Sequence, residues 1–348
     1  MLGRFVCCVV LLIFSLAAGA ETLNVGFHRL TLDDPLDHQP MRAIAFYPTR
    51  APTSPTTLGL FTLPLAEEAP AVAGRHPLLV ISHGNGGTPL ALRDLVLALA
   101  RRGFVVVTLL HPGDNLHDQS RLGALSNLYG RPLQVSEAIS AALADERLAP
   151  LLDPRRIGVI GYSAGGETAL ILAGAQPRLE RLRRYCTQRP DDRDACSAGG
   201  ELLADRNDLT PMADPRVGAV MLLAPLGLMF GSRELADVNV PVLIYSGDAD
   251  KVLDWTRNAA ALARKLPRSA DFHVLLGAGH FVFMAPCSEE ETAATPGLCK
   301  DAEGVDRVAI HRHLIGDAQR FFDEALEPEQ VQVQVQVQVQ VQVQAMLR

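Results

Sequence analysis

The chain has 348 residues, of which 48% are hydrophobic and 20% charged, a composition typical of a globular protein that can bury a full core. Its formal net charge is -7, it contains one Trp, and it has no block of Lys or Arg, which argues against nucleic acid as a partner. The length allows two domains, but α/β enzymes of this size often form one core with an inserted lid, so we predict a single domain over residues 21–326.

The N-terminus has the pattern of an export signal. Arg4 precedes an apolar run over residues 5–14, and small residues follow at Ala18 and Ala20. This pattern predicts a signal peptide of residues 1–20. A membrane anchor is the weaker alternative, because the run is short and no second long apolar stretch follows. The mature protein is therefore expected in the periplasm or outside the cell, without an integral membrane segment.

Apolar runs of strand length alternate with helical patterns over most of the chain, which predicts an α/β fold with a mostly parallel central sheet flanked by helices. The predicted strands are Arg42–Tyr47, Leu78–Ser82, Phe104–Leu110, Ile157–Gly161, Ala219–Leu223, Val242–Ser246 and Phe272–Leu276. The predicted helices are Leu90–Arg102, Val135–Ala144, Ala164–Ala175, Thr256–Lys265 and Val305–Ala325.

The first polar motif, S-H-G-N-G-G over residues 82–87, lies between a predicted strand and a predicted helix. An acyl-transfer enzyme needs preorganised N–H groups for an oxyanion, and one of them commonly comes from such a loop. We predict the backbone N–H of Asn85 as this donor. The alternative is a tight Gly-rich turn without a catalytic role.

A second motif, H-P-G-D-N, begins at His111 and also follows a predicted strand. Loops at the carboxyl ends of parallel strands face the ligand crevice, so these residues either line a pocket, brace a loop or form a purely structural turn.

The third motif is G-Y-S-A-G-G over residues 161–166, which matches G-x-S-x-G between a predicted strand and a predicted helix. In a nucleophile elbow the serine occupies a strained turn, so small residues must flank it. Gly161 and Gly165 fill those places. Ser163 is therefore the predicted nucleophile, and the N–H of Ala164 the predicted second oxyanion donor.

Two polar stretches interrupt the alternation, Gln176–Pro215 and Pro286–Glu303. Both lie where a lid or a substrate rim would be built, and we predict the first to be a lid-like insertion. Solvated surface loops are the alternative for both.

Without residues 1–20 the chain keeps four cysteines, an even count that suggests disulfides in an exported protein. Three pairings are possible, and the local one would close two short loops. Free thiols and a zinc site are the alternatives. Zinc is disfavoured because no His has ligand spacing beside either pair of cysteines. The four are Cys186, Cys196, Cys287 and Cys299.

The fourth motif is the turn S-G-D-A-D after the predicted strand Val242–Ser246. A serine triad needs a buried carboxylate that orients the histidine, and in the chain order Ser, Asp, His it is expected at a late strand end. Asp250 is the predicted acid, with Asp248, a better turn former, as the alternative.

The fifth motif, G-A-G-H-F, follows the last predicted strand. His280 lies on its Gly-flanked loop and comes last in the required order, so we predict it as the general base. His83, His111, Tyr162 and Phe281, which adjoin these motifs, are predicted to contact substrate.

The C-terminal residues 327–348 form a low-complexity tail, with seven Val-Gln repeats over residues 331–344. Alternation of this kind is typical of an aggregation-prone strand, and we assign the tail no function.

The chain resembles exported bacterial α/β-hydrolases described as predicted dienelactone hydrolases, and more distantly platelet-activating-factor acetylhydrolases. The motifs that carry the resemblance are, in chain order, S-H-G-N-G-G, H-P-G-D-N, G-Y-S-A-G-G, G-D-A-D and G-H-F-V-F-M-A-P-C. The resemblance covers about residues 24–325. True dienelactone hydrolases use a cysteine nucleophile where this chain has Ser163, so the likeness extends to the fold and the triad rather than to lactone hydrolysis.

The resemblance implies a serine carboxylesterase that needs no metal or organic cofactor and acts on a small ester or a lipid. Ser163, Asp250 and His280 would form the triad, and Asn85 and Ala164 the oxyanion hole. The alternatives are a hydrolase of short-acyl phospholipids and an exported binding module that has lost catalysis. The oligomeric state is left open.

Overall fold

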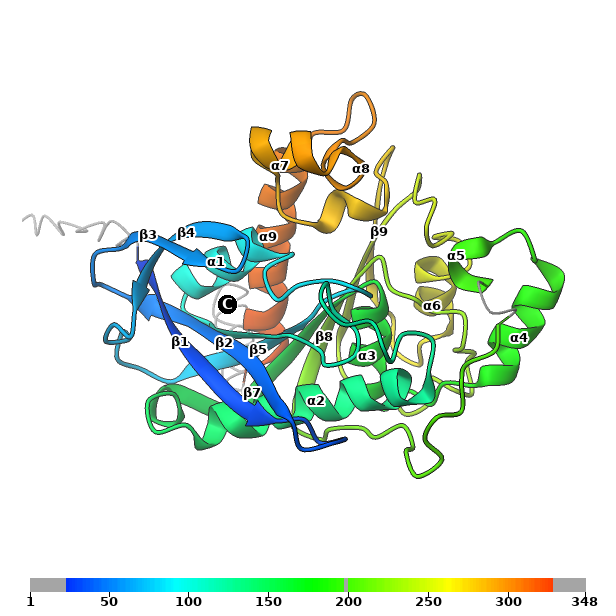
Figure 1. Ribbon diagram of the computed structural model, residues 1–348, viewed down its shortest axis with the longest axis horizontal. Helices are drawn as coiled ribbons and strands as arrows, with labels where there is room; N and C mark the ends of the chain where they lie inside the picture. Colours follow the sequence, from blue (N-terminus) through cyan, green and yellow to red (C-terminus); the bar gives the residue numbers. More distant parts are fainter. Residues whose placement is uncertain (1–22, 197–199, 328–348) are drawn as a thin grey trace, which may run out of the picture.

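The computed structural model describes residues 23–196 and 200–327 (Figure 1). Within them, ten strands form one sheet in the order β10-β9-β8-β7-β5-β6-β2-β1-β4-β3. The strands are β1 (Asn24–Asp33), β2 (Pro40–Thr49), β3 (Ser54–Leu58), β4 (Phe61–Glu67), β5 (His76–Ser82), β6 (Val105–Leu109), β7 (Leu152–Tyr162), β8 (Val217–Leu223), β9 (Val242–Gly247) and β10 (Asp271–Leu275). The helices are α1 (Arg93–Arg101), α2 (Leu125–Ala144), α3 (Ala164–Leu172), α4 (Leu179–Gln188), α5 (Arg193–Cys196), α6 (Ala259–Lys265), α7 (Glu289–Ala294), α8 (Pro296–Cys299) and α9 (Arg307–Ala325).

Six strands are parallel to one another, in the sheet order β6, β5, β7, β8, β9 and β10. At the β6 edge, β2 pairs antiparallel with β6, and β1 pairs antiparallel with β2. The carboxyl ends of parallel strands meet at one edge of a sheet, so the turns after β5, β7, β9 and β10 converge there. The predicted mostly parallel sheet is confirmed, with all seven predicted strands in place.

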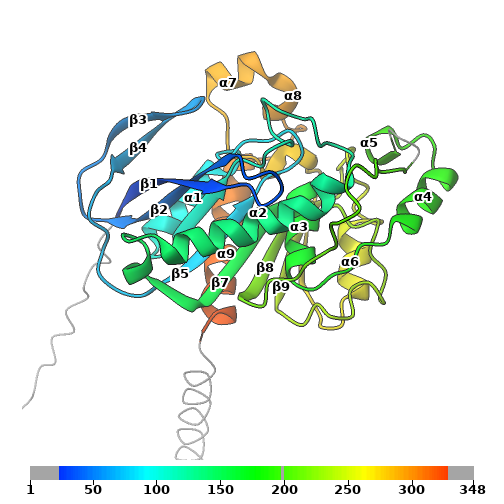
Figure 2. The same cartoon turned by 60° about the horizontal axis from the view of Figure 1, so that its bottom comes forward.

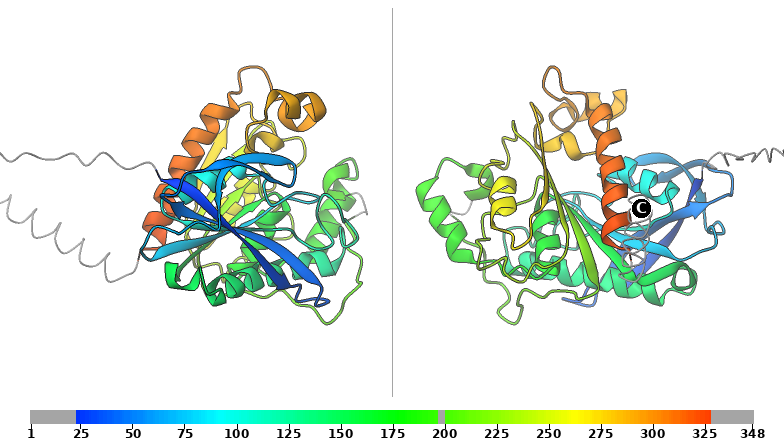
Figure 3. Two further views of the ribbon diagram at one scale, coloured as in Figure 1. Left: turned by 60° about the vertical axis from the view of Figure 1, so that its left-hand side comes forward. Right: turned by 180° about the vertical axis from the view of Figure 1, so that it is seen from behind.

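Helices cover both faces of the sheet because successive side chains of each strand point to opposite sides. In β7, Ile157 and Val159 pack into the core beneath α2, α3 and α6, while Ile160 and Tyr162 pack into the core beneath α1 and α9. Figure 2 shows α2, α3 and α6 on the first face, and Figure 3 (right) shows α9 and α1 on the second.

The structure extends the predicted elements at the β1 edge and in α2. Strands β1, β3 and β4 were not predicted; β3 and β4 each contain a proline, which disfavours a strand assignment except near a sheet edge. Helix α2 begins at Leu125, whereas the predicted helix began at Val135. The prediction missed the first part because Pro132, a residue that normally marks a helix boundary, lies inside the helix.

Both Cys-containing stretches fold into short helices closed by a local disulfide. Cys186 pairs with Cys196 across α4 and α5, and Cys287 pairs with Cys299 across α7 and α8, as the local pairing predicted. In Figure 1, α4 and α5 lie beside α6 at one end of the molecule, while β1 to β4 lie at the other end.

The predicted signal peptide (residues 1–20) and the Val-Gln repeats (residues 331–344) lie outside the described residues. Across residues 23–196 and 200–327, no helix combines the length and apolar character required to cross a bilayer.

Candidate active site

Ser163 lies in the turn that joins β7 to α3, with φ 55° and ψ -117°, a left-handed conformation that is costly for a residue with a Cβ. The two flanking glycines make this turn possible. A Cβ at Gly161 would lie 2.1 Å from the carbonyl oxygen of Gly165, and a Cβ at Gly165 would lie 2.0 Å from that of Ser82. The turn leaves Ser163 partly exposed above the sheet edge.

His280 joins the hydroxyl of Ser163 to the carboxylate of Asp250. Its Nε2 lies 3.1 Å from Oγ of Ser163, and its Nδ1 lies 2.7 Å from Oδ2 of Asp250. A carboxylate only accepts hydrogen bonds, so Nδ1 donates to it and Nε2 is left to accept the serine proton. The arrangement can therefore draw a proton away from the serine oxygen.

Asp250 is held in place by the backbone that follows it. Its Oδ1 accepts hydrogen bonds from the N–H groups of Val252 and Leu253, both at 2.8 Å, and its side chain is fully buried. The alternative acid, Asp248, is exposed and instead accepts a hydrogen bond at 2.6 Å from the N–H of Gly277, in the loop that leads to His280. The structure thus brings Asp250, and not Asp248, to the imidazole.

Two aromatic residues surround the His280 ring. Tyr162 is buried, donates from its hydroxyl to the carbonyl oxygen of His280 at 3.2 Å, and has a ring centroid 5.2 Å from the imidazole. Burial, assisted by the negative charge of Asp250, raises its pKa. Phe281 is partly exposed and packs edge-on against the imidazole at 5.4 Å. Tyr162 is thus placed to position the imidazole from the interior, while Phe281 remains available to a ligand.

The loop over residues 82–87 passes directly beside the serine. A Cβ at Gly84 would lie 3.2 Å from Cβ of Ser163. Among the described residues, the backbone N–H groups of Asn85 and Ala164 donate to no acceptor within the chain. Ala164 is buried, and a buried N–H normally has a partner, whereas Asn85 is exposed. An oxygen supplied by a ligand beside Ser163 could accept from both N–H groups.

A buried ion pair supports this loop from behind. Arg131 of α2 contacts Asp114 at 2.6 Å, with 3% and 0% of the two side chains exposed, and also donates to the carbonyl oxygen of His83. Asp114 in turn accepts a hydrogen bond from the N–H of Gly86 at 2.7 Å. Burial opposes ionisation of Asp114, but the charge of Arg131 and these hydrogen bonds outweigh it and hold its pKa below the usual value.

His83 and His111 lie within the same interior network and do not reach the surface. The Nε2 of His111 contacts Oγ of Ser82 at 2.9 Å, and its Nδ1 contacts the amide oxygen of Gln134 at 2.7 Å. Burial and then the charge of Arg131 lower the pKa of His83 to about 4 and that of His111 well below its ordinary value. Both imidazoles are therefore neutral, and their burial argues against the substrate contact predicted for them.

The sequence motifs do not include Arg131, Gln134 or Glu167. The first two are polar residues three positions apart on one face of α2, a spacing that could have marked a shared partner. Glu167, in the first turn of α3, is buried, and its Oε1 has no hydrogen-bond partner within the described residues. Burial raises the pKa of its carboxyl to about 8, so it is mostly protonated at neutral pH.

Within residues 23–196 and 200–327, no group of three or more His, Cys, Asp or Glu side chains is arranged to hold a metal ion.

The model of the alpha/beta hydrolase family matches residues 78–294, which include the serine, the aspartate and the histidine described above. The chain belongs to this family. Among solved structures, this hydrolase is similar to a ferulic acid esterase from Streptomyces cinnamoneus, with a TM-score of 0.57 and 19% sequence identity over 88% of this chain and 91% of that chain. This similarity supports the predicted fold. A search of curated proteins finds no match.

Proposed function

We propose that this alpha/beta hydrolase cleaves carboxylic esters through a covalent acyl-enzyme on Ser163. The observation that carries the proposal is the continuous hydrogen-bond chain from Ser163 through His280 to Asp250. A hydroxyl is a weak nucleophile by itself, and an adjacent base oriented by a carboxylate is the usual means of activating it.

In the first step, Nε2 of His280 takes the proton of Ser163 while Oγ attacks the ester carbonyl carbon. The carbonyl π electrons move to oxygen, and the N–H groups of Asn85 and Ala164 would stabilise that oxyanion. When the intermediate collapses, the bond to the alcohol oxygen breaks and the imidazolium returns the proton to that oxygen. Asp250 stabilises the imidazolium throughout without taking its proton.

In the second step, a water molecule loses its proton to His280 and attacks the acyl carbon. The Ser163–acyl bond then breaks, and the serine oxygen recovers the proton while the carboxylic acid leaves. Every group that this cycle needs belongs to the chain or to water, and each returns to its initial state.

The direct test compares hydrolysis of p-nitrophenyl acetate by the wild type and Ser163→Ala. We expect kcat/KM to fall by about 10³-fold or more, since removal of the nucleophile leaves only binding and oxyanion stabilisation. Ser82→Ala is the matched control, because Ser82 also contacts an imidazole but is buried, and it should keep most of the activity. Equal rates for wild type and Ser163→Ala would refute the proposal.

The substrate class is the finer part of the proposal. The resemblance to predicted dienelactone hydrolases and platelet-activating-factor acetylhydrolases favours short acyl groups, and the fold shared with a ferulic acid esterase makes aromatic acyl groups worth including. A panel of p-nitrophenyl acetate, methyl ferulate and a short-acyl phospholipid, each measured as kcat/KM, separates these classes. A folded wild type that hydrolyses none of them would favour the binding module.

A further inference from the structure

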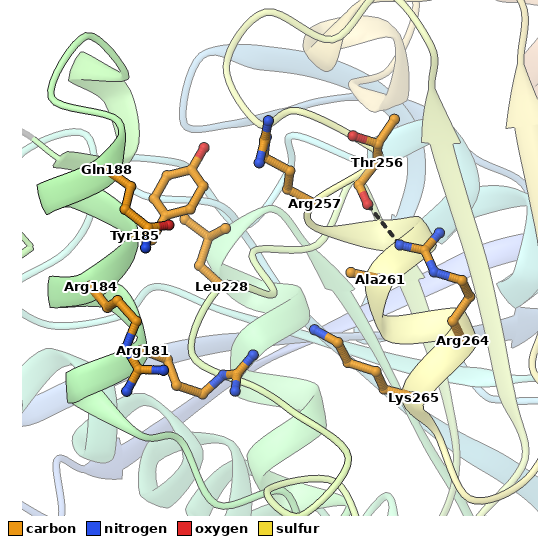
Figure 4. Close-up of a pocket in the computed structure, with 10 residues that line it drawn as sticks. All are labelled: Arg181, Arg184, Tyr185, Gln188, Leu228, Thr256, Arg257, Ala261, Arg264 and Lys265. Atoms are coloured by element: carbon orange, nitrogen blue, oxygen red, sulfur yellow. Dashed lines mark hydrogen bonds between the residues drawn. The ribbon is translucent and has the colours of Figure 1, made fainter.

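A cleft of about 500 Å³ lies between α4 of the Cys186–Cys196 stretch and α6. Figure 4 shows side chains that enter it from both sides, from α4 on one side and from α6 and the turn before it on the other. None of its lining residues belongs to the Ser163 site. Its volume lies within the range of clefts that hold small organic molecules.

The lining residues carry five cationic groups and no carboxylate, although the whole chain has a formal net charge of -7. The cations are Arg181, Arg184, Arg257, Arg264 and Lys265. Like charges held together in one cleft repel one another unless an anion lies between them. A concentration of positive charge on an acidic protein therefore marks this cleft as distinct from the surrounding surface.

Neighbouring groups neutralise these cations only in part. Arg257 lies 3.4 Å from Asp254, and Arg181 lies 4.0 Å from Glu234. Arg264 and Lys265 donate to backbone carbonyl oxygens, at 3.2 Å each, and not to carboxylates. Arg184 makes no hydrogen bond or ion pair with any other residue of the described parts.

Two further observations concern the environment of these cations. Nε of Arg181 is buried and has no hydrogen-bond acceptor among the described residues, although a buried donor normally has one. Burial, followed by the charges of Arg181 and Arg264, lowers the pKa of Lys265. A bound anion would relieve the repulsion between these cations.

The cleft also offers apolar surface. The ring of Tyr185 and the side chains of Leu228 and Ala261 line it beside the cations. Arginine forks bind carboxylate or phosphate oxygens in pairs, while these apolar side chains can pack against a carbon framework. The combination favours an organic anion over a simple inorganic one.

We propose that this cleft binds a small organic molecule that carries two or more anionic oxygen groups, carboxylates or phosphates. Five cations around one cavity match more than one negative charge, and the volume leaves room for the carbon framework. The proposal does not depend on ester hydrolysis, and Ser163→Ala should bind as the wild type does.

The test is isothermal titration calorimetry on the full chain with citrate, fructose 1,6-bisphosphate and inorganic phosphate, at one ionic strength fixed with sodium chloride. Citrate represents the carboxylate arm and the sugar bisphosphate the phosphate arm. We expect saturable binding of at least one organic polyanion, with inorganic phosphate weaker. Arg184→Gln/Arg264→Gln should weaken that binding by about tenfold or more, since two charged donors are lost.

The matched control is Arg183→Gln/Arg268→Gln, which also removes two exposed positive charges but none from the cleft. It should bind within about twofold of the wild type if the interaction is local rather than a response to net charge. Equal weakening in both double variants would overturn the proposal. Absence of saturable binding by either organic polyanion in the folded wild type would overturn it as well.

Discussion

The molecule contains two serine–histidine pairs with nearly the same local geometry and different surroundings. In one, Ser163 contacts Nε2 of His280 at 3.1 Å, and in the other, Ser82 contacts Nε2 of His111 at 2.9 Å. In both imidazoles Nδ1 points to a side-chain oxygen at 2.7 Å. That oxygen belongs to the carboxylate of Asp250 in the first pair and to an amide in the second.

A serine–histidine contact is therefore not by itself a reactive site. A carboxylate stabilises an imidazolium, whereas an amide does not, and the guanidinium of Arg131 further opposes a positive charge on His111. Ser82 is also fully buried, while Ser163 is partly exposed beside two unpaired N–H groups. We therefore infer that the first pair transfers a proton in catalysis, whereas the second holds a loop.

The first prediction changes the residue that Nδ1 of each imidazole contacts. Asp250→Asn keeps the shape but removes the charge that stabilises the imidazolium and fixes its tautomer, so kcat/KM for p-nitrophenyl acetate should fall by about 10⁴-fold. Gln134→Ala should lower it by less than about tenfold while reducing stability by about 1–3 kcal/mol. Similar losses of activity in both variants would remove the distinction between the two pairs.

A second prediction concerns the ion pair that supports the loop over residues 82–87. Arg131→Met leaves the carboxylate of Asp114 buried without its partner, so the free energy of unfolding in urea should fall by about 3–5 kcal/mol. Arg155→Met is the control, because Arg155 pairs with Asp153 while 75% of its side chain is exposed, and it should change stability by less than about 1 kcal/mol. A small effect for Arg131→Met would mean that the loop holds its shape without the ion pair.

A third prediction is a pH dependence of stability set by Glu167. Its pKa is about 8 in the folded protein and that of an ordinary carboxyl when unfolded, so the folded state binds more protons between about pH 4.5 and 8. Its contribution to stability is complete below that window and is lost as pH rises through it. Glu167→Gln should therefore gain stability relative to the wild type as pH rises from 5 to 8.

The measurement is the free energy of unfolding of both proteins at pH 5, 6, 7 and 8, taken as a difference so that other titrating groups cancel. His83 has the opposite effect on stability, because its pKa is lowered to about 4 in the folded protein. The folded state then binds fewer protons than the unfolded state between about pH 4 and 6.5, so the contribution of His83 to stability increases as pH rises through that window. A difference that does not change with pH would show that Glu167 ionises freely in the fold.

The sequence could predict the elements whose signal is local. The buried strands appear as short Val, Ile and Leu runs, and the elbow around Ser163 appears because its two glycines and its flanking strand and helix are contiguous. The choice between Asp248 and Asp250 could be proposed but not decided, because both lie on one turn and only the packing of the loop before His280 separates them.

Features that depend on distant segments gave no comparable signal. Arg131 reaches the loop at residues 82–87 only because α2 continues through Pro132, which sequence rules treat as a helix end. Buried polar residues such as Glu167 look like the exposed face of a helix until the tertiary packing is known. The cationic cleft likewise combines α4 with α6, two segments that are far apart in the chain.

The most direct test of the central claim is to treat the folded wild type with a fluorophosphonate and locate the modified residue by peptide mass spectrometry. We expect one stoichiometric adduct on Ser163, lost in His280→Ala and unaffected in Gln134→Ala. An adduct on Ser82 in place of Ser163, or no adduct on a folded protein, would contradict it.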